Sequence, residues 1–183
     1  MLNDKQKREL LKIARETLER YLAGEKPHEM KISDPLLKEK RGVFVTLHEK
    51  KNLRGCIGVI ISEEQVYKTV RDMAIESATA DPRFPPVTEN ELKDIDIEIS
   101  VLTIPQRVTS PDKIVLGRDG VIVKSGWCQG VFLPQVAIET GWSKEEFLSC
   151  LCSQKAGLSP EAWKDPGTEL YTFQAEVFSE KEL

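Results

Sequence analysis

Six consecutive residues, Leu53-Arg54-Gly55-Cys56-Ile57-Gly58, combine strand-forming side chains with a guanidinium, a thiol and two glycines. Side chains two residues apart on an extended strand point to the same face. The spacing therefore predicts that Arg54 and Cys56 lie side by side. Because glycine has no side chain, Gly55 and Gly58 would let another backbone segment or a ligand approach closely. We therefore expect a site on this strand.

The composition predicts a globular domain. The chain has 183 residues, of which 40% are hydrophobic and 31% charged, which is too apolar for a disordered chain. The net charge of −4 gives no general reason to expect binding to nucleic acid. We find no run of the roughly 20 apolar residues that a membrane helix needs and no signal-peptide core. We therefore expect a cytoplasmic protein that does not enter membranes, with its four cysteines reduced.

Helices and strands are expected to alternate irregularly along the chain. Apolar residues at helical spacing predict helices over 3–23, where Asn3 and Gln6 form a cap and Gly24 ends the helix, and over 63–80, 134–140 and 143–156. Pro27 and Pro35 bracket a loop that contains His28. Strands are expected at 43–48, 53–61, 95–101, 114–116, 121–123, 130–133 and 169–178. Short connections favour antiparallel pairing, so the predicted fold class is α+β.

A hairpin is predicted where the polar turn 49–52 joins the first two strands. With a two- or four-residue loop, Val45 pairs with Cys56 and His48 pairs with Leu53. His48 then points to the opposite face from Cys56, whereas a three-residue loop reverses that relationship.

Cys56 is the candidate catalytic nucleophile, because a thiolate attacks and a cation such as Arg54 favours its formation. The alternative is a buried cysteine that packs as a small hydrophobic residue. Arg54 needs a partner, because an unpaired buried charge is costly. That partner could be an anionic ligand, held by bidentate hydrogen bonds. It could equally be one of three internal carboxylates, Asp81, Asp96 or Glu98.

The segment Asp81-Pro82-Arg83-Phe84-Pro85-Pro86 is stiffened by three prolines. Such a loop can hold Asp81 and Arg83 in place beside a ligand. The alternative is a helix stop in which the two residues only fix the turn. The predicted ligand-binding set is Arg54, Gly55, Gly58, Asp81 and Arg83.

No metal site is predicted. Cys150 and Cys152 are two apart on an expected helix and so point to different sides, and neither CxxC nor HxxxH occurs. Gly55 and Gly58 lie within a strand and not at a strand-to-helix turn, so no phosphate loop is indicated. The cofactor is left unknown.

The hexapeptide 53–58 resembles the signature of the AMMECR domain family, named for the Alport syndrome, mental retardation, midface hypoplasia and elliptocytosis chromosomal region. Other family segments follow in order over nearly the whole chain: 42–46, 81–87, 98–102, 120–123, 133–137 and 155–158. The resemblance implies one domain over 1–183 with two closely packed lobes and no linker. It implies an antiparallel sheet flanked by helices, a second, smaller α/β lobe, and a cleft lined by the signature.

Two functions are compatible with this resemblance, because the family has no settled biochemical activity. The first is a cytoplasmic domain that binds an anionic small molecule, with Cys56 available for thiol-dependent enzyme chemistry. Relatives are often encoded beside, or fused to, Memo-type proteins and radical S-adenosylmethionine enzymes. The alternative is therefore an interaction module that acts with such a protein. Nucleic-acid binding has little support from the charge.

Overall fold

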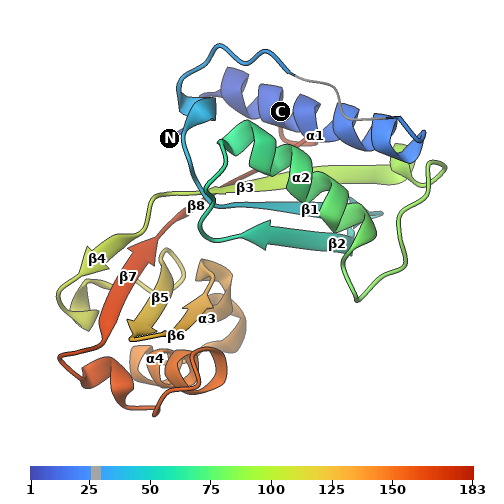
Figure 1. Ribbon diagram of the computed structural model, residues 1–183. Helices are drawn as coiled ribbons and strands as arrows, with labels where there is room; N and C mark the ends of the chain where they lie inside the picture. Colours follow the sequence, from blue (N-terminus) through green and yellow to red (C-terminus); the bar gives the residue numbers. More distant parts are fainter. Residues whose placement is uncertain (26–29) are drawn as a thin grey trace. The chain divides into compact units, whose positions relative to one another are not determined.

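The computed structural model describes residues 1–25 and 30–183, which form two compact units (Figure 1). The first unit comprises Met1–Leu102 and Glu176–Leu183, and the second comprises Thr103–Ala175. Each contains a four-stranded sheet and helices, which confirms the α+β prediction. The predicted loop at Pro27 and His28 lies outside the described residues. Within the described part, the chain has no helix with the length and apolar character to span a bilayer.

The first sheet has the strand order β2-β1-β3-β8, and β1 pairs antiparallel with both of its neighbours. It is built from β1 (Val43–Glu49), β2 (Asn52–Val59), β3 (Ile95–Leu102) and β8 (Ala175–Ser179). Apolar and polar residues alternate along β3, with Ile95, Ile97, Ile99 and Val101 buried and the residues between them half-buried. One face of the sheet is therefore apolar and the other polar.

Two helices, α1 (Asp4–Leu22) and α2 (Val66–Thr79), cover the apolar face of this sheet (Figure 1). The predicted cap of α1 is present as a capping box between Asn3 and Gln6. Gly24 follows the helix with a φ of 78°, a backbone conformation that favours glycine. The first unit also has two short 3-10 helices, Leu36–Lys38 and Leu92–Asp94.

The second unit has the strand order β4-β7-β5-β6. Its strands are β4 (Gln106–Val108), β5 (Gly120–Ser125), β6 (Cys128–Phe132) and β7 (Glu169–Phe173). Its helices are α3 (Pro134–Thr140), α4 (Lys144–Cys150), a π-helical turn (Leu151–Lys155) and 3-10 turns at Pro111–Lys113 and Ala162–Lys164. A separate core, centred on Phe147, Leu148 and Leu151, holds these elements together.

Two predicted strands are wrong. Residues 114–116 form no strand, because the Val115 amide donates to the Asp119 carboxylate (2.9 Å) instead of to a neighbouring strand. Residues 169–178 form two strands in different sheets, β7 and β8, which are interrupted at Gln174. The Gln174 backbone pairs there with Thr103, which donates its own amide to the Gln174 carbonyl (2.8 Å).

Candidate functional site

The β1–β2 hairpin places Cys56 on the polar face of the first sheet. Its two-residue turn has both residues at positive φ, Lys50 at 49° and Lys51 at 71°. His48 pairs with Leu53 as predicted, but the register then shifts by one residue. Arg54 is the extra residue of this β-bulge.

Because of the bulge, Cys56 pairs with Thr46 and not with Val45. Thr46 and His48 are two apart on β1, so both share a sheet face with Cys56. For a two-residue turn, the hairpin geometry predicts that His48 points away from Cys56. The turn has two residues, but this prediction is wrong, because the inserted residue reverses the alternation of every residue that follows it.

The polar face is the one opposite α1 and α2, and we call its central residues the Cys56 face. They come from three adjacent strands and are all half-buried: Thr46, His48, Cys56, Asp96 and Glu98. Thr46 lies opposite both Cys56 on β2 and Glu98 on β3, and His48 lies opposite Asp96.

At both glycines of the hexapeptide, other atoms of the protein occupy the space that a side chain would take. A Cβ at Gly55 would lie 2.1 Å from the carbonyl oxygen of Ser77 in α2, and a Cβ at Gly58 would lie 2.3 Å from the Phe44 ring. Gly55 thus permits α2 to pack closely on β2, and Gly58 permits the ring of its cross-strand partner Phe44 to lie over it.

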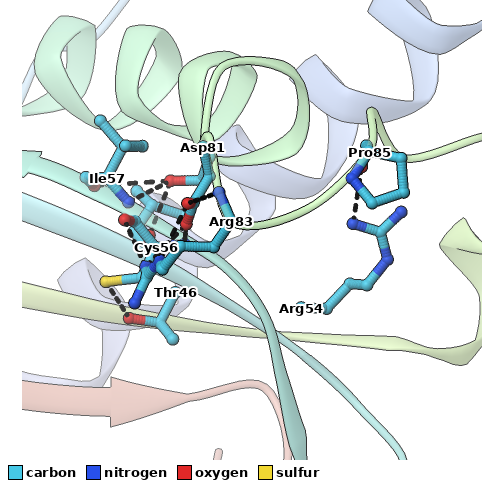
Figure 2. A network of polar contacts seen from close by, with 9 residues as sticks. Thr46, Arg54, Cys56, Ile57, Asp81, Arg83 and Pro85 are labelled. Atoms are coloured by element: carbon cyan, nitrogen blue, oxygen red, sulfur yellow. Dashed lines mark hydrogen bonds and ion pairs between the residues drawn. The ribbon is translucent and has the colours of Figure 1, made fainter.

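Arg54 is used to anchor β2 to the loop that follows α2. Its guanidinium donates from Nη1 to the Pro85 carbonyl (2.9 Å) and from Nε to Glu91 (3.1 Å), and Nη2 lies 3.0 Å from the same carboxylate. Figure 2 shows the side chain directed toward Pro85 and away from Cys56. The prediction that Arg54 and Cys56 lie side by side is therefore wrong. The internal partner of Arg54 is Glu91, which was not among the three carboxylates considered.

Cys56 is held by polar contacts on both its backbone and its thiol (Figure 2). Its amide donates to Asp81 Oδ2 (2.9 Å), and its carbonyl accepts from Arg83 Nη2 (3.3 Å). Thr46 Oγ1 donates to Cys56 Sγ at 3.3 Å. The structure therefore brings Asp81 and Arg83, but not the Arg54 guanidinium, to Cys56.

Asp81 and Arg83 form a side-on ion pair. Arg83 Nε lies 2.9 Å from Oδ1, and Nη2 lies 2.7 Å from Oδ2, of a carboxylate that is almost fully buried. The hydrogen bonds from Arg83, with a smaller contribution from the Cys56 amide, hold the pKa of Asp81 well below its ordinary value, although burial of the carboxylate acts in the opposite direction. The pKa of Arg83 is raised, mainly by Asp81 and in smaller part by Cys56. Arg83 is thus the cation beside the thiol.

His48 and Glu98 form a second pair on the Cys56 face. His48 Nε2 lies 3.8 Å from Glu98 Oε2 and has no hydrogen-bond partner among the described residues, although the atom is buried. Asp96, opposite His48, is paired with Lys181 at 3.3 Å.

Ser77 is a further structural residue of the site. Its hydroxyl donates to the Val45 carbonyl (2.7 Å) and accepts from the Ile57 amide (2.9 Å), so it bridges two residues that pair across β1 and β2. Sequence reasoning assigned no role to Ser77, Thr46 or Glu91. No local pattern marks them, because each acts on a residue distant in sequence.

Within residues 1–25 and 30–183, no group of three His, Cys, Asp or Glu side chains is placed to bind a metal ion together. All four cysteines are free thiols. The site can therefore supply a thiol, an imidazole, carboxylates and one half-exposed guanidinium.

The fold and the site define a two-unit α+β protein with a cysteine on the polar face of its first sheet. The chain belongs to the AMMECR1 family, since the family model of that description matches residues 11–178. This confirms the resemblance seen in the sequence.

The relatives include archaeal proteins of nearly the same length. A protein of Methanothermobacter thermautotrophicus is 48% identical over 182 residues, covering 94% of this chain and 93% of the relative. A Methanosarcina barkeri protein is 45% identical over 191 residues, covering 100% and 94%. The crystal structure of uncharacterized protein PH0010 from Pyrococcus horikoshii is 43% identical, with a TM-score of 0.79 and coverage of 94% and 90%.

Proposed function

We propose that the protein is a small-molecule-binding domain that receives an anionic group at Arg83, next to Cys56. The observation that carries this proposal is the way Asp81 holds Arg83. Asp81 fixes one edge of the guanidinium, Nε and Nη2, while 53% of the Arg83 side chain remains exposed. A guanidinium fixed in this way is preorganised for an anion, because its position costs little further ordering on binding.

Arg83 has donor capacity left for a ligand. Nη1 has no hydrogen-bond partner among the described residues, and it lies outside the Nε–Nη2 edge that Asp81 holds. Carboxylates and phosphates are the groups that arginine binds best. The ligand is therefore a small carboxylate or phosphate, and Cys56 either lines the binding site or reacts with the ligand. The proposal places the protein in the cytoplasm, where thiols stay reduced.

The test compares two alkylating reagents that differ in charge. Iodoacetate and iodoacetamide modify the same thiol, but only iodoacetate carries a carboxylate. We expect the ratio of iodoacetate to iodoacetamide rates at Cys56 to exceed the ratio at the exposed Cys128, measured by peptide mass spectrometry. The preference should weaken as salt is added, because ions screen the attraction.

Arg83→Gln should lower the ratio at Cys56 several-fold, because the attraction by a nearby cation is lost. The chain offers a matched control in Arg118, which binds the buried Asp119 side-on (2.7 and 2.8 Å) in the second unit. Arg118→Gln should leave the ratio unchanged. Arg83→Lys keeps the charge and should retain part of the preference. Equal ratios in the parent protein and in folded Arg83→Gln would refute the anion site.

A further inference from the structure

The bulge at Arg54 brings a histidine into the neighbourhood of Cys56. Thr46 lies directly opposite Cys56, and His48 is the next residue of β1 on the same face. His48 is therefore a diagonal neighbour of Cys56, at a Cα separation of roughly 7–8 Å, within reach of long side chains. Without the inserted residue, the two side chains would lie on opposite sides of the sheet.

The carboxylate of Glu98 lies near the imidazole of His48. Glu98 Oε2 lies 3.8 Å from His48 Nε2, a buried nitrogen that lacks a hydrogen-bond partner in the described chain. Buried polar atoms are nearly always paired, so a small rotation that lets Nε2–H donate to Glu98 is favourable. A proton on Nε2 leaves Nδ1 as the acceptor of the ring.

We propose that Cys56, His48 and Glu98 act together as nucleophile, proton acceptor and positioning carboxylate, and that they transfer an acyl group from a small anionic thioester. This inference rests on the proposed function, because Arg83 supplies the contact to the anionic group. Thr46 supports it by donating a hydrogen bond to Sγ at 3.3 Å, which helps to fix the position of the sulfur.

The reaction balances with water as the only co-reactant. The Cys56 proton passes to His48 Nδ1, and the sulfur forms a bond to the acyl carbon. The carbon–sulfur bond of the substrate breaks, its electron pair goes to the leaving thiolate, and that thiolate takes the proton from His48. Water then adds to the acyl-cysteine with His48 as base, which releases the acid and restores the thiol.

Several other charged groups face His48 and Cys56 and contribute to any pH dependence. Asp96 lies opposite His48 and is paired with Lys181, and Arg83 lies beside Cys56. Asp96→Asn is therefore the control for a general loss of negative charge next to His48.

The first experiment measures alkylation of Cys56 by iodoacetamide against pH, with Cys128 in the same protein as internal reference. Iodoacetamide is neutral, so the measurement does not depend on the anion site. His48→Gln should slow the reaction at about pH 7 roughly tenfold and leave the rate at about pH 10 unchanged, because at high pH the thiol needs no proton acceptor.

Glu98→Gln should reproduce more of this change in the pH profile than Asp96→Asn does. If His48→Gln fails to fold, Glu98→Gln keeps the test decisive, because its carboxylate is one-third exposed. An unchanged pH profile in the folded variants would overturn the role of His48 and Glu98.

The second experiment supplies the succinyl thioester of N-acetylcysteamine, which is anionic, and follows thiol release and protein mass. We expect turnover or a succinyl adduct on Cys56, which Cys56→Ser abolishes. Neither product in the parent protein would overturn acyl transfer. The two failures are distinguishable. Equal ratios of iodoacetate to iodoacetamide rates in the parent protein and in Arg83→Gln refute the anion site, and with it the anionic substrate. An unaltered pH profile for iodoacetamide refutes the roles of His48 and Glu98 and leaves the anion site standing.

Discussion

Gly55 in β2 lies directly beneath Ser77 in the last turn of α2, so close that the helix carbonyl oxygen occupies the space of a side chain. This contact joins the strand that carries Cys56 to the helix that precedes Asp81. The central glycine of the hexapeptide is therefore a packing requirement of the site and not an opening to it.

Gly55→Ala should destabilise the protein by about 3 kcal/mol or more, because a Cβ at 2.1 Å from a backbone oxygen forces the helix away from the sheet. Urea unfolding measures this loss. Gly167→Ala is the matched control, since nothing lies within 4 Å of its Cβ position, and it should change stability little. A stable Gly55→Ala protein would contradict the packing described here.

Ser77→Ala should cost about 1–3 kcal/mol, because the Val45 carbonyl and the Ile57 amide lose the hydroxyl that bridges them. Thermal or urea unfolding gives the difference. Ser153→Ala removes a hydroxyl that bonds only to the Ser149 carbonyl on an exposed helix turn, and it should be close to neutral. Equal effects of the two substitutions would argue against the bridge.

Arg54→Ala should lower stability by about 2 kcal/mol, because it leaves the Pro85 carbonyl and Glu91 without their charged donor. The ratio of iodoacetate to iodoacetamide rates at Cys56 should stay unchanged. Arg107→Ala breaks an exposed pair with Glu169 and should cost less than about 1 kcal/mol. If Arg54→Ala abolishes the iodoacetate preference in a folded protein, Arg54 is a ligand anchor after all.

The stability of the first unit should fall in acid partly because of Asp81. Its pKa is lower in the folded protein than in the unfolded chain, mainly because of Arg83, so the unfolded state takes up the proton first. The contribution of Asp81 is fully present above the unfolded pKa of about 3.9 and is lost progressively as the pH falls below it.

Asp81→Asn should therefore be less stable than the parent protein at about pH 7, and the difference should narrow as the pH falls from about 4 to about 2. Urea unfolding at each pH measures both curves. Asp112→Asn, on an exposed 3-10 turn, provides the control. A difference that stays constant over this range would show that the Asp81 charge does not contribute.

Much of the fold was predictable because it depends on neighbours in sequence. The capping box of Asn3 and Gln6 and the glycine after α1 involve residues within one or two turns of the helix end. The alternation along β3 reflects one apolar face, which any packing against helices preserves. Residues 114–116 show the limit, because an apolar run formed no strand once Asp119 accepted the Val115 amide.

The site was predictable only in part. Cys56, Asp81 and Arg83 were named from the sequence and do lie together, since the proline-stiffened loop returns to β2. The partner of Arg54 was missed, because Glu91 is 37 residues away along the chain. The role of Ser77 was missed for the same reason.

Local periodicity and capping were thus enough to predict the helices and most strands, and short sequence motifs were enough to predict the family. These patterns involve residues that are close together along the chain. The side of the sheet on which His48 lies, and the cation that accompanies Cys56, were outcomes of folding. A single bulged residue sets the first, and packing of α2 and its following loop against β2 sets the second. The face of His48 and the identity of this cation have no periodic signal in the sequence, because both depend on contacts between segments that are distant along the chain.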